Sequence, residues 1–483
     1  MNKNIKELAP REVWKHFYDL TQIPRPSKKE KKAVDFIVDF GKKLGLETIV
    51  DEVGNVIIRK PASEGRENAK GVILQGHLDM VPQKNSDKIH DFEKDPITAY
   101  VDGEWVTADG TTLGADNGIG VAAAMAVLES NSVKHGPIEA LFTIDEETGM
   151  TGAQNLKPGV LKGQILINLD ADDENELYVG CAGGLDGTFT FKYFAEPVEP
   201  EYEAHKISIT GLKGGHSGTD IILGRGNVNK IMFRLLADLS DKIDLSLADV
   251  NGGNMRNAIP REAFAVVVVP KNKVKEFDKT VKKLNDTVKD ELRHTEPDMK
   301  ISTEKTDLPK HVIDKDTQSR LIDAIYACPN GVIRMSDTLA GLVETSTNLA
   351  IVKSENGKIQ VSCLMRSSVD SAKEALARSK KAVFSLAGAK CKFTGGYPGW
   401  KPDPDSTVLE KMKSVYKELY GKEPEVKAIH AGLECGLLGG IYPGLDMISC
   451  GPTIQAAHSP DEKVKIDAVE KWWNFLVKTL ESI

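Results

Sequence analysis

The chain has 483 residues, which is long for one hydrophobic core and predicts two or three domains. Its hydrophobic share of 40% and charged share of 28% are ordinary for a soluble globular protein. The net charge of -8 leaves no basic excess to neutralise phosphates, so a nucleic-acid partner is not expected.

The N-terminal stretch and the cysteines predict a cytoplasmic protein. The first residues, MNKNIKELAPREVWKHF, lack the apolar core of a signal peptide. No apolar run approaches the ~20 residues that span a bilayer, so a membrane partner is not expected either. The six cysteines form no C-x-x-C pair and predict buried, reduced thiols rather than a disulfide framework.

Residues 1–185 predict short buried strands that alternate with helices. The first 45 residues have the pattern of two helices. GVILQG (71–76), IEALFTIDEE (138–147) and GQILINLDADDE (163–174) each begin as an apolar strand, and NGIGVAAAMAVLES between the first two predicts an Ala-rich helix. This alternation indicates an α/β catalytic domain with a mixed, mostly parallel sheet between helices, whose site lies beyond the carboxyl ends of the strands.

Residues 186–398 predict an inserted α+β lid domain of two similar lobes. Alternating strands and long charged helices replace the earlier pattern, with helices near 226–240, 271–293, 315–327 and 371–387. These form two α-β-β-α lobes, about 186–305 and 306–398. After the Pro- and Gly-rich TGGYPGWKPDPDS the α/β pattern returns, so residues 399–483 are expected to complete the catalytic domain.

Ionisable residues gather where the predicted strands end. They are His77, Asp79, Asp116, Glu146, Glu147, Asp170 and His458. Imidazoles and carboxylates without a cysteine are a ligand set suited to zinc or another divalent first-row ion. Because the set exceeds what one ion can use, it predicts two ions that share a carboxylate and hold a hydroxide between them.

The chemistry assigns a role to each of these side chains. Asp116, in a loop between two glycines, is expected to bridge the ions, and the other ligands are His77, Glu147, Asp170 and His458. Asp79 is expected to orient His77, and Glu146 to be the general base that later returns its proton to a leaving amine. Taken singly, each carboxylate is also typical of a helix cap or an acidic turn, but the whole set favours the metal centre.

Six motifs resemble, in order and context, those of the di-zinc exopeptidases, a family that includes glutamate carboxypeptidases, aminoacylases and dipeptidases. They are GHLDMV, GADNGIG, DEETGMTGA, GGHSG, NAIP and GPTIQAAHSPDE. The resemblance covers essentially the whole chain, and HAGLECGLL with the doubled lid makes it most similar to the Xaa-His, or cytosol non-specific, dipeptidases. It implies the same five ligands, the same roles for Asp79 and Glu146, and a cis peptide bond after Asp116. It also implies two divalent ions, with zinc expected first and cobalt or manganese as alternatives.

The resemblance further implies that the lid holds the substrate. His216 in LKGGHSG resembles a lid histidine that stabilises the developing oxyanion. Arg366 lies where the family often has an arginine that grips the substrate carboxylate, and Arg256 is a rival for that role. Asn257 and Asn348 occupy equivalent places in the two lobes and are expected to bind substrate. Many relatives have one lobe and borrow the lid histidine from a second subunit, so both a monomer and a homodimer remain open.

The expected function is metal-dependent hydrolysis of unblocked dipeptides, Xaa-His and other Xaa-Xaa, by the shared hydroxide with Glu146 as base. Alternatives with the same metal centre are an N-acyl amino acid deacylase and a tripeptidase, because the shape of the lid pocket decides among these substrates. A more remote alternative is a non-catalytic binding protein on this scaffold, which would lack a ligand or the base.

Overall fold

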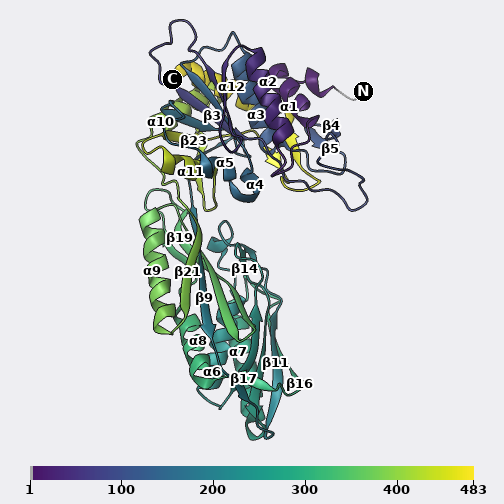
Figure 1. The fold of residues 1–483 in the computed structure, drawn as a ribbon, viewed down its shortest axis with the longest axis vertical. Helices are drawn as coiled ribbons and strands as arrows, with labels where there is room; N and C mark the ends of the chain where they lie inside the picture. Colours follow the sequence, from purple (N-terminus) through teal and green to yellow (C-terminus); the bar gives the residue numbers. More distant parts are fainter. Residues whose placement is uncertain (1–3) are drawn as a thin grey trace. The chain divides into compact units, whose positions relative to one another are not determined.

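The computed structural model describes residues 4–483 and contains two compact units (Figure 1). Unit 1 comprises the residues up to Cys181, Trp400–Ala428 and Leu433–Ile483, and unit 2 comprises Ala182–Gly399 and Ile429–Gly432. Within the described range, every helix is too short or too polar to cross a membrane. The roles of catalytic domain (1–185 and 399–483) and lid (186–398) stay predictions.

Unit 1 combines a large sheet, a small sheet and surrounding helices. Its helices are η1 (Ile5–Glu7), α1 (Arg11–Thr21), α2 (Lys31–Lys43), α3 (Ala115–Glu129), α4 (Glu146–Gly149), α5 (Thr151–Asn155), α10 (Thr407–Tyr420), α11 (Glu434–Ile441) and α12 (Ile466–Ser482). Its strands are β1 (Glu47–Val50), β2 (Val56–Lys60), β3 (Val72–His77), β4 (Ala99–Asp102), β5 (Trp105–Ala108), β6 (Ile138–Thr143), β7 (Ile165–Asn168), β8 (Glu176–Cys181), β22 (Glu425–Ile429), β23 (Asp446–Ser449), β24 (Ile454–Gln455) and β25 (Lys463–Lys465).

The large sheet is mixed and parallel only at its centre. Its strand order is β1-β2-β6-β3-β7-β23-β8-β22, and β6, β3, β7 and β23 run parallel to one another. β2 and β8 join this centre in antiparallel fashion. A separate four-stranded sheet has the order β24-β25-β5-β4.

The composition of the central elements explains why they are buried. Every residue of β3, β6 and β7 is buried, as expected for parallel strands covered on both faces. Helix α3 packs on β3 and β6, and its alanines allow nearly the whole helix to be enclosed. The carboxyl ends of the parallel strands therefore open onto a site that a tightly packed core supports.

Unit 2 is built on a nine-stranded antiparallel sheet. Its helices are η2 (Ile221–Leu223), α6 (Val228–Ser240), η3 (Lys271–Lys273), α7 (Val274–Glu291), α8 (Lys315–Ala327) and α9 (Asp370–Leu386). Its strands are β9 (Gly183–Lys192), β10 (Ala195–Pro197), β11 (Tyr202–Thr210), β12 (Gly215–His216), β13 (Ser246–Gly252), β14 (Ala258–Ile259), β15 (Ala263–Pro270), β16 (Lys300–Thr306), β17 (His311–Ile313), β18 (Gly331–Met335), β19 (Val343–Glu355), β20 (Lys358–Ser367) and β21 (Lys390–Tyr397).

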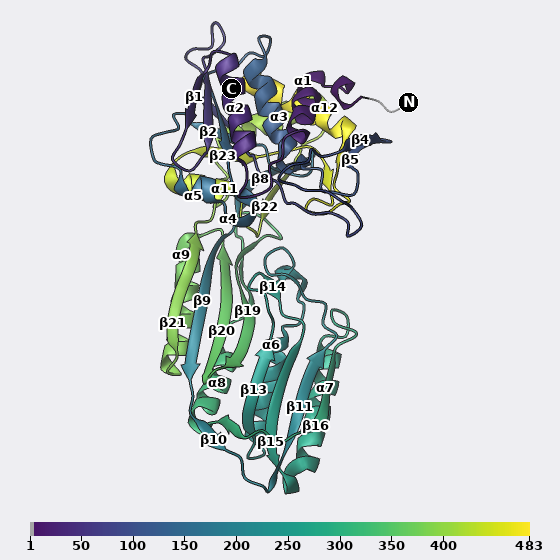
Figure 2. The same cartoon turned by 45° about the vertical axis from the view of Figure 1, so that its right-hand side comes forward.

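The sheet of unit 2 consists of two halves with matching topology. The order is β16-β11-β15-β13-β19-β20-β9-β21 (Figure 2), and β18 pairs with β19 beside this path. One half runs β11-α6-β13-β15-α7-β16 along the chain, and the other runs β9-α8-β19-β20-α9-β21. β9 pairs with β20 and β21 of the second half, although it precedes the first half in sequence and the predicted first lobe (186–305) includes most of it.

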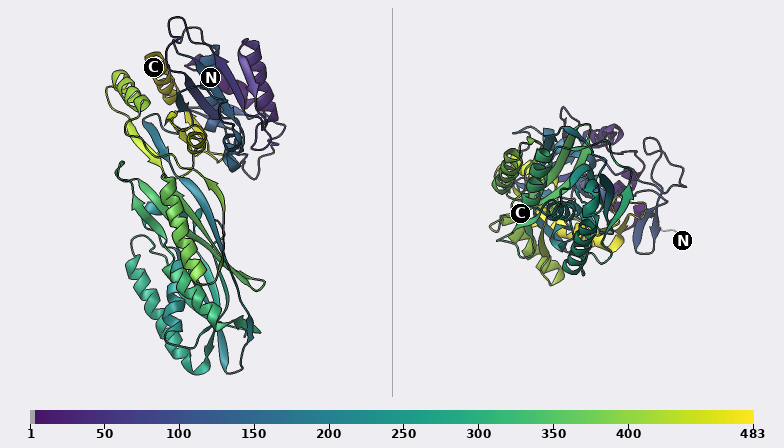
Figure 3. Two further views of the ribbon diagram at one scale, coloured as in Figure 1. Left: turned by 60° about the vertical axis from the view of Figure 1, so that its left-hand side comes forward. Right: turned by 90° about the horizontal axis from the view of Figure 1, so that it is seen from below.

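The four long helices of unit 2 form a row against its sheet (Figure 3). Along this row α7 contacts α6, α6 contacts α8, and α8 contacts α9. One continuous hydrophobic core lies between the helices and the strands of both halves. The two halves therefore stabilise each other as a single packed layer.

Candidate metal centre

The predicted ligands of unit 1 lie at the carboxyl ends of neighbouring parallel strands. His77 ends β3, Glu147 follows β6 at the start of α4, and Asp170 follows β7 by two residues. Asp116 lies at the start of α3, where the peptide bond to the next residue is cis, and His458 lies in the loop between β24 and β25. This is the edge at which open α/β sheets bind ligands.

Asp116 stands between the two histidines. Its Oδ1 is 3.1 Å from Nε2 of His77, and its Oδ2 is 3.1 Å from Nε2 of His458. Nε2 of His77 also lies 3.4 Å from Oδ1 of Asp170, and Nε2 of His458 lies 3.0 Å from Oε2 of Glu147. One carboxylate thus offers a separate oxygen to each of two ligand groups.

These distances produce two triads that fit divalent cations. One is His77, Asp116 and Asp170, the other is Asp116, Glu147 and His458, and in each the ligand atoms lie within 4.8 Å of one another. Oε1 of Glu147 is buried and accepts no hydrogen bond from the described residues. Hydrogen bonds from His458 to the two carboxylates raise the pKa of that histidine to about 10, so the cluster favours positive charge. The residues present therefore suit a pair of cations.

Asp79 connects the first histidine to helix α4. Its Oδ1 lies 3.4 Å from Nδ1 of His77, the ring nitrogen that faces away from the ligand cluster. Its two oxygens accept the backbone N–H groups of Glu146 (3.0 Å) and Glu147 (3.2 Å). A single buried carboxylate therefore sets the orientation of one predicted ligand and the position of the two glutamates.

The side chain of Glu146 has a different environment from its neighbour. It points into the same cluster, where it forms a further triad with His77 and Glu147. Burial raises the pKa of its carboxyl well above the usual value. No hydrogen bond from the described part of the chain reaches its carboxylate, so its oxygens are available to exchange a proton.

In unit 2, His216 and Arg366 place two donors against one another. Nδ1 of His216 accepts the backbone N–H groups of Gly218 (3.3 Å) and Thr219 (3.2 Å), which leaves the ring hydrogen on Nε2. That Nε2 lies 3.4 Å from a guanidinium nitrogen of Arg366. Both groups are hydrogen-bond donors, and neither accepts from the other. An anionic oxygen could accept hydrogen bonds from both.

The two candidate arginines of unit 2 differ in their partners. Arg366 is only 5% exposed, and among the described residues no carboxylate lies within ion-pair distance of it. It donates instead to the hydroxyl of Tyr397 at 3.2 Å. Arg256, in contrast, forms an ion pair with Asp186 at 2.9 Å and donates to Thr188. Arg366 therefore retains a positive charge without a counter-ion.

The two predicted asparagines also differ. The amide nitrogen of Asn348 is buried and donates to the backbone carbonyls of Arg256 (3.2 Å) and Ala258 (2.7 Å). Asn257, between these two residues, is exposed, and its backbone carbonyl accepts the backbone N–H of Ser217 at 2.8 Å. The two hydrogen bonds of Asn348 therefore fix the position of the backbone segment that contains Asn257.

Sequence reasoning did not assign a role to Glu434, which lies under the cluster. Its Oε2 accepts hydrogen bonds from Gln75 (2.6 Å) and Thr143 (2.7 Å), and Gln75 in turn accepts one from Asn168 (2.6 Å). Burial raises the pKa of Glu434 to about 7. The network joins β3, β6 and β7 just before their functional residues. The only sequence signal was its place in the motif HAGLECGLL.

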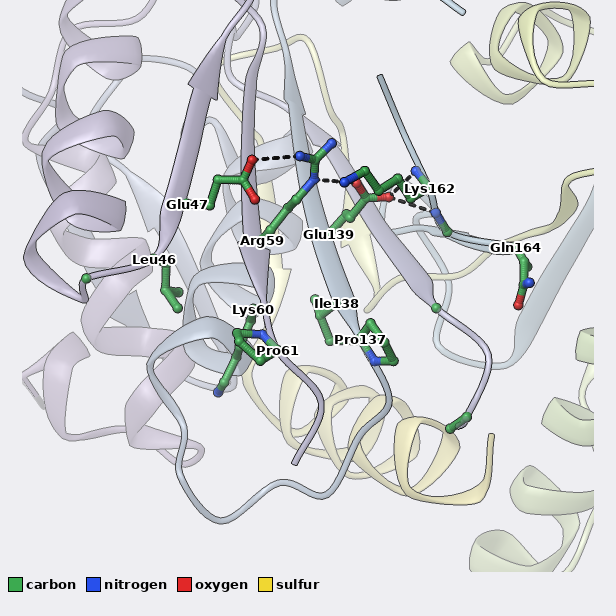
Figure 4. Close-up of a pocket in the computed structure, with 14 residues that line it drawn as sticks. Leu46, Glu47, Arg59, Lys60, Pro61, Pro137, Ile138, Glu139, Lys162 and Gln164 are labelled. Carbon is green, nitrogen blue, oxygen red and sulfur yellow. Dashed lines mark hydrogen bonds and ion pairs between the residues drawn. The ribbon is translucent and has the colours of Figure 1, made fainter. Parts of the chain in front are cut away.

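A cavity of about 600 Å³ in unit 1 lies at the opposite ends of these strands (Figure 4). Its lining includes the residues that precede β3, β6 and β7. Three of its charged groups pair with one another: Arg59 donates to Glu139 at 2.9 Å and to Glu47 at 2.8 Å. Glu139 also accepts the N–H of Lys162. This cavity therefore offers none of the chemistry of the ligand cluster.

A mixed α/β unit that gathers side chains able to hold divalent ions at the carboxyl ends of its parallel strands has the features of a metal-dependent hydrolase. Within that class, residues 73–482 match the model of peptidase family M20/M25/M40, and the chain belongs to this family. The resemblance indicated by the motifs and the expected mixed α/β peptidase fold are confirmed.

Two similar proteins are at least 46% identical to this chain over nearly its whole length. The cytosol non-specific dipeptidase of Escherichia coli (strain K12) is 46% identical over 479 residues, which are 99% of each protein. The crystal structure of aminoacylhistidine dipeptidase from Vibrio alginolyticus is 48% identical, with a TM-score of 0.95 over 100% of this chain and 98% of that one. The aminopeptidase PepT of Bacillus cereus ATCC 10987, at 17% identity and a TM-score of 0.57 over 98% and 99% of the chains, shares the fold.

Proposed function

We propose that this protein hydrolyses unblocked dipeptides, Xaa-His among them, in a metal-dependent reaction. The observation that carries the proposal is the pair of triads sharing Asp116, in a chain whose relatives at 46% and 48% identity over nearly its full length are both named dipeptidases. We place the reaction in the cytoplasm, in keeping with the name of the Escherichia coli relative. We propose no nucleic-acid or membrane partner. The proposed reaction is compatible with either a monomer or a homodimer.

The proposed cofactor is a pair of divalent ions, with zinc first and cobalt or manganese as alternatives. His77 and Asp170 would hold one ion, Glu147 and His458 would hold the other, and Asp116 would serve both. When bound, two such ions polarise a carbonyl and lower the pKa of water toward neutrality. The cluster supports this assignment because the ligand atoms of each triad already lie within 4.8 Å of one another.

Glu146 is the proposed general base. Its carboxylate takes a proton from the attacking water and returns it to the nitrogen of the leaving amino acid. Its position supports this role, because Asp79 fixes the backbone of Glu146 while the carboxylate itself accepts no hydrogen bond from the described residues. Asp79 has the proposed task of orienting both His77 and the start of α4.

Unit 2 has the proposed task of holding the substrate. His216 donates from Nε2 to the developing oxyanion, and its fixed tautomer supports this part. Arg366 binds the substrate carboxylate, which its buried, uncompensated charge favours over Arg256. Asn257 and Asn348 belong to the same substrate-binding set, with Asn348 acting through the segment that it holds.

The test is hydrolysis of a small substrate panel by the purified protein. Zinc-loaded protein is given Ala-His, Leu-Gly, N-acetyl-Ala and a tripeptide, each with and without chelator. We expect chelator-sensitive cleavage of the free dipeptides alone. Cleavage of N-acetyl-Ala alone would make the protein a deacylase, and cleavage of the tripeptide alone would make it a tripeptidase. Silence on every substrate, with metal bound, would contradict the proposal and favour a binding protein.

A further inference from the structure

Glu462 is buried, and both oxygens of its carboxylate accept hydrogen bonds from backbone N–H groups. The residue is only 2% exposed, and its carboxylate accepts the backbone N–H groups of four consecutive residues. Oε2 accepts those of Leu113 (2.8 Å) and Gly114 (2.9 Å), and Oε1 accepts those of Ala115 (2.7 Å) and Asp116 (3.2 Å). A carboxylate suits this place because it offers acceptors on both oxygens and no donor.

Two of the four donors precede helix α3 and two are its first residues, where Asp116 has a non-helical backbone conformation. The first N–H groups of a helix have no partner within the helix, and the N-cap residue Gly114 has no side chain to supply one. Glu462 therefore binds the backbone segment that leads into the regular part of α3, from a distance of more than three hundred residues in sequence. These hydrogen bonds fix the backbone of Asp116, the residue shared by both triads.

Glu462 also closes the loop that carries His458. The loop spans residues 456–462 between the paired strands β24 and β25. Its backbone has positive φ at Ala456 (54°) and His458 (63°), a region that non-glycine residues seldom adopt. The side chain of His458 is 52% exposed, so packing alone does little to hold it. Glu462 ends the loop, donating its N–H to Ser459 at 3.1 Å.

We propose that Glu462 is a positioning residue that keeps Asp116 and His458 in register and thereby sets the affinity of the second triad for its ion. The inference rests on the proposed function of the cluster, but it concerns metal binding and can be tested without turnover. Asp116 and His458 are separated by 342 residues. Glu462 connects them because it bonds to the backbone of one and lies four residues after the other.

The chemistry of the contact predicts an order among substitutions. Glu462→Gln keeps the size of the side chain but turns an NH2 group toward two N–H donors, so half of the contacts become repulsive. Glu462→Asp is shorter but keeps acceptors on both oxygens. If the role is electrostatic positioning, Asp retains more function than Gln; if the side chain only fills space, the order is reversed. Asp461→Asn, at the exposed neighbouring position, is the matched control.

The experiment measures metal binding and kinetics on the full chain. Wild type, E462Q, E462D and D461N are loaded with Zn²⁺ alone and dialysed against graded chelator, and zinc per chain is measured by atomic emission. We expect wild type and D461N to keep two ions together, whereas E462Q releases one of them roughly 10- to 100-fold more readily. E462D lies between them. At limiting zinc kcat falls by a similar factor and excess zinc restores it, while KM changes less than about threefold.

Three results would overturn the inference. They are wild-type affinity for both ions in E462Q, tighter binding in E462Q than in E462D, and a loss of kcat in E462D that excess zinc does not restore. If E462Q does not fold, E462D alone decides by its zinc titration. The wild type is assayed for dipeptide hydrolysis in the same series. If the wild type binds two ions but is inactive, the proposed function is contradicted. The zinc affinities of the variants then still decide whether Glu462 is a positioning residue.

Discussion

Replacing Glu146 by Gln decides whether this residue is a base or a further ligand, since its oxygens lie within ligand distance of His77 and Glu147. The substitution keeps the size of the side chain. Because no hydrogen bond from the described residues reaches the carboxylate, the folded state loses no such bond. We therefore expect the free energy of unfolding to change by no more than about 0.5 kcal/mol.

The effect on turnover is expected to be much larger. General acid–base catalysis contributes roughly 10²- to 10⁴-fold, which at 1.36 kcal/mol per tenfold corresponds to about 2.7–5.5 kcal/mol in the barrier. The kcat of E146Q should fall by that factor, with two ions still bound. KM should stay within about threefold of wild type, because in the proposal Glu146 makes no contact that holds the bound substrate.

The same substitution one residue further along provides the control. Glu147 belongs to a triad, so E147Q should lose an ion under chelator concentrations that E146Q withstands. Initial rates at saturating zinc, zinc per chain and urea unfolding are measured on both variants. Loss of an ion from E146Q would make Glu146 a ligand. A drop in kcat of less than tenfold with both ions retained would refute its assignment as the base.

Three further predictions concern the rest of the chain. Arg366→Met should raise KM by roughly 10- to 100-fold through loss of a charge-assisted bond, whereas Arg256→Met should change it little; equal effects would contradict the assignment. Metal removal should lower the melting temperature, because saturating ions at 100 Kd add about 2.7 kcal/mol; an unchanged melting temperature would contradict binding to the folded state. In unit 2, a hydrogen bond from Cys363 and the ammonium of Lys380, 3.1 Å away, lower the pKa of the Cys328 thiol to about 6. The thiolate therefore stabilises the fold above the usual thiol pKa and loses this effect as pH falls toward 6. The stability of wild type relative to Cys328→Ser should rise between pH 6 and 9, by about 4 kcal/mol at most, and flat urea-unfolding profiles would refute it.

The gathering of the cluster was predictable because it depends on local patterns. His77 and Asp170 follow apolar runs, and parallel strands bring their carboxyl ends to one edge. Asp116 was found through its glycine-flanked loop. The structure brings these residues together with His458, while the roles given to them stay predictions. The helices of unit 2 were also predictable, since 315–327 coincides with α8 and 226–240 nearly coincides with α6.

The supporting contacts were not predictable from the sequence. Glu462 bonds only to backbone groups, which have no residue identity, and its partners are about 350 positions away. Glu434 bonds to Gln75 and Thr143 on two strands from a different part of the chain. A pairing such as β9 with β20 depends on the whole sheet, because an alternating strand pattern does not specify its neighbour.

The position of β9 has a consequence for how the protein is made. A ribosome releases this strand before the first half of the unit 2 sheet, yet its partners β20 and β21 emerge roughly 170–200 residues later. Until then both edges of β9 are unpaired and open to wrong partners. Unit 1 has the same dependence, because β23 inserts beside β7 only after unit 2 has been synthesised. We expect nascent chains that stall before residue 390 to need a chaperone, and His458 to join the ligand cluster only after unit 2 has been synthesised.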